Sequence, residues 1–308
     1  MLRLPDDWVW DSWVADDGER YHLFFLRAPR ALGDPGLRHT AARIGHATST
    51  DLVRWEVCAD ALEPAAGRWD DLALWTGSVA RGDDGVWRLY YSALSTACGL
   101  GIRDQRIGMA ESDDLFGWRR VGDRPLVAPD PRWYVSGTWR DPFVFKDPAG
   151  DGWHMLITAR GTGLSRFHDG VVGHARSADM VTREVHPPVS FPDGFGELEV
   201  PQVRVVEGQP LLVFTCHPDQ QSAEQQYAFG RFCTWSVEGE TLTGPWSIGD
   251  ARPFRGEPTL CAAPLVRRRD GGWVLLGFRN LEPDAPPQLD VVDPIPVKLH
   301  DGELIDLR

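Results

Sequence analysis

A short pattern recurs along this chain: an apolar residue, then Gly-x-Ala, then Ser-x-Asp. The copies start at Ile44, Ile107 and Val172, so the repeat length is about 64 residues. Self-similarity at a period of this size is typical of propellers and other arrays of identical units, because one unit alone does not bury its apolar surface. Roughly five such units fill the 308 residues, and we therefore expect a repeat architecture.

Each repeat has the same internal order of strand and turn signals. Asp/Gly turns such as 16–18 and 83–85 precede runs of aromatic and aliphatic residues, here 21–26 and 87–92. A turn of this type between two apolar runs is a strong hairpin signal. The Gly-x-Ala segment supplies a third strand, and a fourth follows the Ser-x-Asp turn. The pattern predicts an all-β fold: one five-bladed β-propeller domain over residues 1–308, with four antiparallel strands per blade.

Composition restricts the partners of the chain. The net charge of −13 argues against nucleic acid or an anionic membrane, because both require basic patches. The first residues lack the apolar stretch of a signal peptide, and we expect a cytoplasmic protein. Five scattered cysteines without a CxxC pair are expected to be free thiols in a reducing compartment; they are Cys58, Cys98, Cys216, Cys233 and Cys261.

No cofactor is expected. The sequence contains no HExxH helix motif, no glycine-rich phosphate loop and no serine-nucleophile elbow. His46 and His174 resemble metal ligands in isolation, but the equivalent position in the second repeat is Met109, so we interpret both histidines as scaffold residues. The three longest loops, 27–41, 95–105 and 161–170, follow the second strands of the first three units and are expected to form the rim of a pocket.

Charged residues occur in the first strands of units 1, 3 and 4, where apolar residues dominate. In a propeller these strands line the central channel, so Asp11, Asp141, Glu197 and Glu199 are expected to converge, with Arg140 beside them. Carboxylates brought together in a channel repel one another, which raises the pKa of at least one of them. Glycoside hydrolysis requires one protonated and one ionised carboxyl group. Fourteen Trp residues add flat apolar surfaces for sugar rings, although most are expected to serve the core.

Five motifs resemble those of the invertase-type glycoside hydrolase family 32 and the levansucrase-type family 68, and they occur in family order over residues 8–220. The motifs are Val9-Trp10-Asp11-Ser12-Trp13, the stretch from Gly45 to Glu56, Trp75-Thr76-Gly77-Ser78, Arg140-Asp141-Pro142, and Glu197-Leu198-Glu199-Val200-Pro201. The resemblance implies a retaining enzyme that hydrolyses β-fructofuranosides, sucrose or short fructo-oligosaccharides, or transfers their fructosyl group.

The same resemblance implies roles for individual residues. Asp11 would be the nucleophile, Glu199 the general acid and then base, and Asp141 the residue that stabilises the transition state. The two glutamates lie on one strand face, so their roles can be exchanged; the Pro after Glu199 favours Glu199 as the acid. Substrate contacts are implied for Trp10, Trp13, Trp75, Thr76, Arg140, Glu197 and His217.

Two other functions fit the same constellation. An inverting arabinofuranosidase or xylosidase resembling glycoside hydrolase family 43 would share the propeller and its three carboxylates, with Asp11 as general base. A catalytically silent propeller would bind sugars without turnover. All three readings expect a small oligosaccharide or glycoside as the partner.

Overall fold

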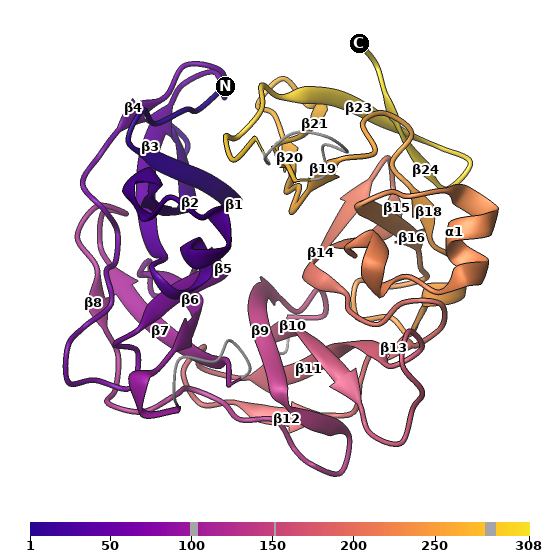
Figure 1. The fold of residues 1–308 in the computed structure, drawn as a ribbon, viewed down its shortest axis with the longest axis horizontal. Coiled ribbons are helices and arrows are strands. Elements are labelled where there is room, and N and C mark those ends of the chain that lie inside the picture. Colours follow the sequence, from indigo (N-terminus) through magenta and orange to yellow (C-terminus); the bar gives the residue numbers. More distant parts are fainter. Residues whose placement is uncertain (99–103, 151, 281–287) are drawn as a thin grey trace.

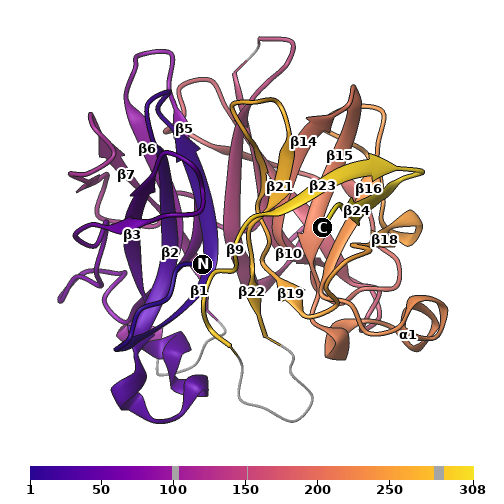
Figure 2. The same cartoon turned by 90° about the horizontal axis from the view of Figure 1, so that it is seen from above.

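The computed structural model describes residues 1–98, 104–150, 152–280 and 288–308. Five four-stranded antiparallel sheets surround a central channel, as Figure 1 shows in the view down the shortest axis. The prediction of a five-bladed β-propeller is therefore confirmed. Seen from above in Figure 2, the first strands run along the channel, so residues from one strand lie at different depths of the molecule.

The first three blades are continuous in sequence. Blade 1 contains β1 (Asp7–Asp16), β2 (Tyr21–Pro29), β3 (Arg43–Ser49) and β4 (Glu56–Val57). Blade 2 contains β5 (Ala73–Arg81), β6 (Trp87–Leu94), β7 (Arg106–Ser112) and β8 (Arg119–Arg120). Blade 3 contains β9 (Tyr134–Lys146), β10 (Trp153–Gly161), β11 (Gly170–Ser177) and β12 (Glu184–His186).

Blades 4 and 5 are less regular. Blade 4 contains β14 (Glu199–Val206), β15 (Gln209–Thr215), β16 (Thr234–Glu238) and β18 (Arg252–Pro253). Blade 5 contains β20 (Leu265–Arg267), β21 (Trp273–Leu275), β23 (Ile295–His300) and β24 (Glu303–Asp306). Two small sheets complete the strands: β13 (Ser190–Phe191) pairs in parallel with β17 (Trp246–Ser247), and β19 (Leu260–Cys261) pairs with β22 (Phe278–Arg279).

Short helices lie in the connections between strands. The described residues contain one α-helix, α1 (Ala223–Phe229). The 3₁₀ helices are η1 (Arg30–Leu32), η2 (Pro35–Thr40), η3 (Thr96–Cys98), η4 (Pro218–Gln220) and η5 (Ile248–Asp250). In the part of the chain that the structure describes, no helix is both long and apolar enough to cross a bilayer.

The first strand of blade 5 is not continuous. It is divided into β19 and β20, and Ala262 between them has a positive φ of 43°. Pro264 has no N–H to donate to a sheet partner, which explains why the ladder is interrupted there.

The repeated Ser-x-Asp segment closes the turn between the third and fourth strands. In blade 1 the Ser49 hydroxyl accepts a hydrogen bond from the Leu52 N–H at 2.9 Å. The Asp51 carboxylate accepts two more, from the N–H groups of Val53 and Arg54. The same contacts recur in blade 2, and the Asp contacts recur in blade 3. The repeat in the sequence is therefore a repeated turn, because only short side chains with oxygen acceptors satisfy these backbone donors.

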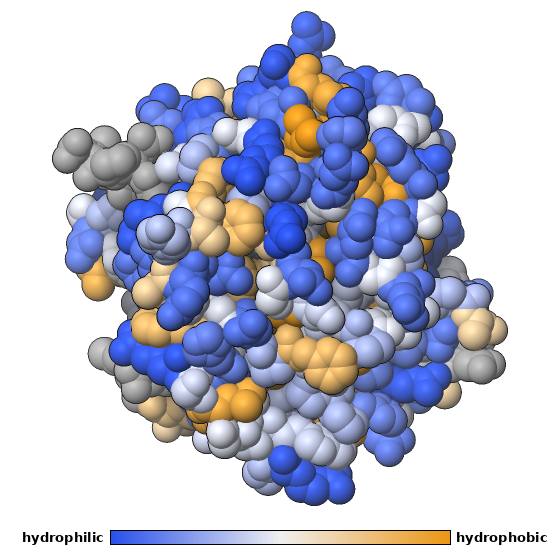
Figure 3. All heavy atoms as spheres, turned by 90° about the vertical axis from the view of Figure 1, so that its right-hand side faces the viewer, coloured by the Kyte–Doolittle hydropathy of each residue, from blue (hydrophilic) through white to orange (hydrophobic). Residues whose placement is uncertain are grey.

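Apolar residues between neighbouring blades form the core. Trp139, Trp235 and Trp246 are each less than 2% exposed, so these three indoles serve packing and not ligand binding. Hydrophilic side chains cover most of the face that includes blade 4, shown in Figure 3. The ring closes where Leu2 pairs with Val291, next to blade 5.

Hydroxyl side chains connect one blade to the next around the channel. The Ser92 hydroxyl of β6 accepts a hydrogen bond at 2.7 Å from the backbone N–H of Asp141 in β9. The Thr215 hydroxyl of β15 accepts one at 2.9 Å from the N–H of Ala262. Each bond is made to a residue whose backbone has left the regular ladder, and it satisfies a donor that the neighbouring strand does not reach.

The expectation of five free thiols is wrong for two cysteines. Cys233 and Cys261 form a disulfide that links blade 4 to blade 5, with Cα atoms 5.2 Å apart. They are 28 positions apart in sequence. The residues next to them are joined as well, because the Thr234 hydroxyl donates to the carbonyl oxygen of Leu260 at 2.6 Å. Cys58, Cys98 and Cys216 are free. The cytoplasmic location stays a prediction, and the argument from free thiols no longer supports it.

Candidate active site

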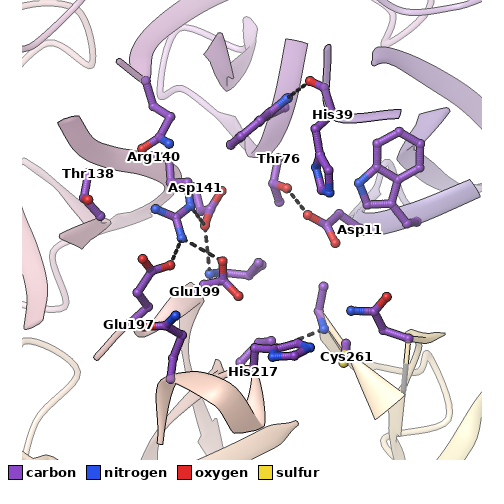
Figure 4. Close-up of a pocket in the computed structure, with 18 of the residues that line it drawn as sticks. Asp11, His39, Thr76, Thr138, Arg140, Asp141, Glu197, Glu199, His217 and Cys261 are labelled. Atoms are coloured by element: carbon purple, nitrogen blue, oxygen red, sulfur yellow. Dashed lines mark hydrogen bonds and ion pairs between the residues drawn. The ribbon is translucent and has the colours of Figure 1, made fainter. Parts of the chain in front are cut away.

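A cavity of about 860 Å³ opens at one end of the channel and is lined by residues of all five blades. Figure 4 shows its carboxylates facing one another across the opening. All but one of the site residues expected from the sequence line it: Asp11, Asp141 and Glu199, together with Trp10, Trp75, Thr76, Arg140, Glu197 and His217.

Backbone irregularities place the acidic groups at the floor of this cavity. The β1–β2 register shifts between Trp10 and Ser12, which leaves Asp11 in a bulge with a φ of 31°. Asp141 has a φ of 55° at a register shift in blade 3. Val200, next to Glu199, has a φ of 50° in blade 4. Positive φ in non-glycine residues is strained, and the same irregularity at matching places in three blades directs each carboxylate towards the channel.

One hydrogen bond and several nearby charges act on the Asp11 carboxylate. The Thr76 hydroxyl donates to its Oδ2 at 2.5 Å. Burial raises the pKa of Asp11 to about 6, with a further increase from Glu199, while the Thr76 hydrogen bond and the charges of Arg38 and Arg140 act in the opposite direction. Asp11 is therefore mostly ionised at neutral pH and able to act as a nucleophile or base.

Asp141 is buried more deeply, at 5% exposure. Thr158 donates to its Oδ2 at 2.9 Å, and the Val200 N–H donates to the same oxygen at 3.3 Å. Burial raises the pKa of Asp141 to about 6, against the lowering effect of Arg140, whose Nε lies 3.5 Å from Oδ2. These donors fix the carboxylate in one orientation, as is needed for a group that accepts hydrogen bonds from sugar hydroxyls.

Glu197 and Glu199 share one guanidinium but have different surroundings. Arg140 Nη2 donates to Glu199 Oε1 at 2.7 Å and also to Glu197 Oε2. Arg160 adds a second guanidinium contact to Glu197, at 2.6 Å, and makes none to Glu199. Burial together with the nearby carboxylates raises the pKa of Glu199 to about 7. Burial also acts on Glu197, but the two guanidinium groups outweigh it and lower its pKa below the usual range.

The two glutamates are therefore chemically distinct. Glu197 is held as a carboxylate, which cannot donate a proton at neutral pH. Glu199 takes up a proton close to neutrality and releases it again, which suits a group that alternates between acid and base. The electrostatics favour Glu199 as the proton donor, the same assignment that the following Pro favours from sequence.

The wall beside Asp11 comes from η2, inside the loop 27–41 that the sequence places at the rim. The Arg38 guanidinium lies over the Trp10 ring, 5.5 Å from its centroid. The indole N–H of Trp75 donates to the carbonyl oxygen of His39 at 2.7 Å. Burial and the neighbouring Arg38 lower the pKa of His39 to about 4, so its ring is neutral at neutral pH. Loop length alone indicated this wall, and no sequence signal identified Arg38 or His39.

Trp13 does not line this cavity, contrary to the prediction. It lines a smaller cavity of about 270 Å³, to which Asp141 also contributes. Residues of β1 beyond the bulge lie further along the channel, because a strand advances about 3.3 Å per residue. Asp141 lines both cavities and so lies between them. Trp13 and the larger cavity that holds the carboxylates are therefore on opposite sides of Asp141.

The other two predicted rim loops contribute unequally. Gln105 lines the cavity, while residues 99–103 of that loop lie outside the described residues. None of the described residues 161–170 lines it. That loop instead contacts the start of blade 4, where His168 lies 3.0 Å from Asp193 and the Gly170 N–H donates to the carbonyl oxygen of Phe195.

No sequence prediction includes Arg160, because charged residues were expected to converge on the channel only where they lie in first strands. Arg160 ends the apolar run of β10, a second strand, where a charged residue is equally out of place. The disulfide at the cavity wall, by contrast, gave no sequence signal.

The two histidines interpreted as scaffold lie inside the blades. His46 Nε2 is 3.0 Å from His22 Nδ1, and His174 Nε2 is 2.8 Å from His154 Nδ1. Among the described residues, no group of three or more His, Cys, Asp or Glu side chains is arranged to hold a metal ion.

Comparison of the sequence with known proteins gives one family. Residues 13–250 match the glycosyl hydrolases family 32 N-terminal domain. The match contains Asp141 and Glu199 and begins just after Asp11. The raffinose invertase of Escherichia coli is 31% identical over 192 residues, which cover 58% of this chain and 38% of the invertase.

A second curated relative, the sucrose-6-phosphate hydrolase of Escherichia coli, is 26% identical over 305 residues, covering 91% of this chain and 56% of the hydrolase. The chain thus spans between about two fifths and just over half of these two relatives. Among solved structures, the inulosucrase from Halalkalicoccus jeotgali bound to kestose has a TM-score of 0.75 at 22% identity, covering 99% of this chain and 89% of that one. At this identity the likeness concerns the fold alone.

Proposed function

Because this chain belongs to glycosyl hydrolase family 32, we propose that its pocket is the active site of a retaining glycoside hydrolase acting on β-fructofuranosides. One observation carries the proposal: three carboxyl groups from three blades meet in one cavity, and Glu199 holds a proton more tightly than Asp11 and Asp141 do. Asp11 has a pKa of about 6, Glu199 of about 7, and Asp141 is locked by its donors. A single site thus holds an ionised attacking group and a protonated donor near neutral pH.

In the first step Asp11 attacks the anomeric carbon of the fructosyl group. Glu199 donates its proton to the glycosidic oxygen, the bond between that oxygen and the anomeric carbon breaks, and an ester forms between the fructosyl group and Asp11. Asp141 accepts hydrogen bonds from the ring hydroxyls, which strengthen as positive charge develops on the sugar. Trp10 and Trp75 form the apolar walls around it.

In the second step Glu199, now a carboxylate, takes a proton from water or from a sugar hydroxyl. The oxygen so activated attacks the anomeric carbon and releases Asp11, which completes either hydrolysis or fructosyl transfer. Two inversions give net retention. Sucrose and short fructo-oligosaccharides such as kestose, the ligand of the inulosucrase, are the substrates we propose.

The test is fructose release from sucrose, raffinose and kestose by the wild-type protein, Asp11→Asn and Glu199→Gln. We expect release by the wild type and a loss of at least about a hundredfold in either variant, because each removes a group that acts in the transition state. Asp6→Asn, at an exposed position just before β1, is the matched control and should retain full activity. Undiminished activity in Asp11→Asn would contradict the proposed nucleophile.

A further inference from the structure

Arg160 contacts only one of the paired glutamates. Its Nη2 lies 2.6 Å from Glu197 Oε1 and 3.3 Å from Gln220 Oε1. Its Nη1 lies 3.7 Å from Asp169, which holds the guanidinium from the opposite side. The side chain is about one-quarter exposed and lines the cavity. Arg160 is therefore a fixed cation next to Glu197 and makes no contact within 4 Å with Glu199.

Arg140, in contrast, serves both glutamates with a single nitrogen. Its Nη2 donates to Glu199 Oε1 and to Glu197 Oε2, and its Nε faces Asp141. With Arg140 alone, the two glutamates would compete for one donor, and a proton held by the pair would be divided between them. A second donor that contacts only one of the glutamates ends this sharing of the proton. The charge-assisted hydrogen bond stabilises the ionised form of the glutamate it contacts, so the proton resides on the other one.

We propose that Arg160 is a positioning residue that keeps Glu197 ionised and so leaves the transferable proton of the pair on Glu199. The inference deepens the proposed function and rests on it for the catalytic meaning of that proton. The placement of the proton is a property of the protein alone and can be measured without substrate.

The other charged or titratable groups around the pair favour neither glutamate as clearly. The glutamate pair is faced by Asp11 of β1 and Asp141 of β9. It is also faced by Cys216 and His217, which follow β15, and by Asp219 of η4. Asp141 raises the pKa of Glu199, in the same direction as its burial. Arg140 and Arg160 are the two cations that lower the pKa of Glu197, and only Arg160 acts on Glu197 alone.

The first test is a ¹³C NMR titration of the glutamate carboxyl carbons, with Glu197→Gln and Glu199→Gln used to assign the two signals. In the wild type we expect the Glu199 signal to titrate near pH 7 and the Glu197 signal to titrate below the range of an exposed glutamate. In Arg160→Met the Glu197 proton affinity should rise about tenfold to a hundredfold, since one pKa unit is a factor of ten. Arg160→Lys keeps the charge and should restore most of the wild-type titration.

The second test compares kcat/KM at pH 5 and pH 7. In Arg160→Met the ratio of the pH 7 value to the pH 5 value should fall below that of the wild type. At pH 7 the proton of the pair is then divided between the two glutamates and fewer molecules carry it on Glu199, whereas at pH 5 Glu199 is protonated in both proteins. Arg176→Met is the matched control, since it removes the same charge from the neighbouring strand β11, outside the cavity.

Three results would overturn the inference: an unchanged Glu197 titration in Arg160→Met, a wild-type proton that resides on Glu197, or a loss of activity that is equal at both pH values and not rescued by Lys. Failure of the proposed function has a different signature. In that case the titration behaves as described while the wild-type protein releases no fructose.

Discussion

At the scale of single residues, the site works because four acidic groups in one cavity do not share one proton affinity. Burial alone would raise the pKa of all of them. The guanidinium groups of Arg140 and Arg160 offset this for Glu197, and hydrogen bonds and Arg38 partly offset it for Asp11. For Glu199 the nearby carboxylates of Glu197 and Asp141 add to the effect of burial against that of Arg140, and its pKa is about 7. In the proposed mechanism, the division between acid and nucleophile thus follows from the different charges that surround each carboxylate.

A bell-shaped pH dependence of kcat/KM follows from these values. The proposed mechanism requires ionised Asp11, with a pKa of about 6, and protonated Glu199, with a pKa of about 7. Activity should therefore fall below about pH 6 and above about pH 7. Initial rates at low substrate concentration across pH 4 to 9 measure this profile.

In Arg38→Met the acid limb of this pH profile should move to higher pH, because a charge that lowers the pKa of Asp11 is lost. An acid limb that stays in place in that variant would contradict the field effect of Arg38.

The raised pKa of Asp11 also makes it a source of instability. A carboxyl group whose pKa is 3.8 unfolded and about 6 folded favours the folded state less and less as pH rises through that interval. Asp11→Asn should therefore stabilise the protein at pH 8 by about 1–3 kcal/mol and leave it unchanged near pH 4. Thermal unfolding at the two pH values measures the difference, with Asp6→Asn as the surface control. Equal shifts at both pH values would show that ionisation of Asp11 is not the cause.

At the scale of strands, a bulge in the first strand of each of blades 1 to 4 directs side chains into the site. A regular strand alternates its side chains between the two faces of the sheet, which would point neighbouring residues away from a common centre. The register shifts at Asp11, Asp141 and Val200 break the alternation. In blade 2 the shift falls between Trp75 and Gly77, which places the Thr76 hydroxyl on Asp11.

Gly77 is required by this bulge for a steric reason. A Cβ at that position would lie 1.9 Å from the backbone oxygen of Tyr90, so strands β5 and β6 would have to separate. Gly77→Ala should lower the free energy of unfolding by at least about 2 kcal/mol, which urea denaturation measures. Gly272→Ala is the control, because its Cβ would meet only the Asp270 side chain, at 3.3 Å. A stability loss no greater than that of the control would show that the β5–β6 contact yields easily.

Sequence patterns predicted those parts of the strands that depend on local chemistry. The Ser-x-Asp turns were visible because the same short side chains satisfy the same backbone donors in each copy. The carboxylates were visible because charge in an apolar first strand is rare. Arg38 and the pair of Cys233 and Cys261 were not, since their roles depend on which loop and which strands pack together. The break between β19 and β20 was missed although Pro264 signals it.

At the scale of the whole molecule, the propeller brings together residues that are nearly two hundred positions apart, because first strands from different blades line one channel. Hydrogen bonds from backbone N–H groups to hydroxyl side chains of neighbouring blades, and the β-bridge between Leu2 and Val291, join the blades into a ring around this channel. The fold class was predictable from the repeat alone. The depth of each residue along the channel was not, as the position of Trp13 demonstrates.

The stereochemistry of transfer tests the central claim most directly. Wild-type protein is incubated with sucrose in aqueous methanol, and the methyl fructofuranoside that forms is identified by NMR, because methylation fixes the anomeric configuration. Attack by Asp11 followed by methanol activated by Glu199 gives methyl β-fructofuranoside, the retained anomer. Formation of the α anomer would contradict the covalent role of Asp11 and make it a general base, as in the inverting alternative.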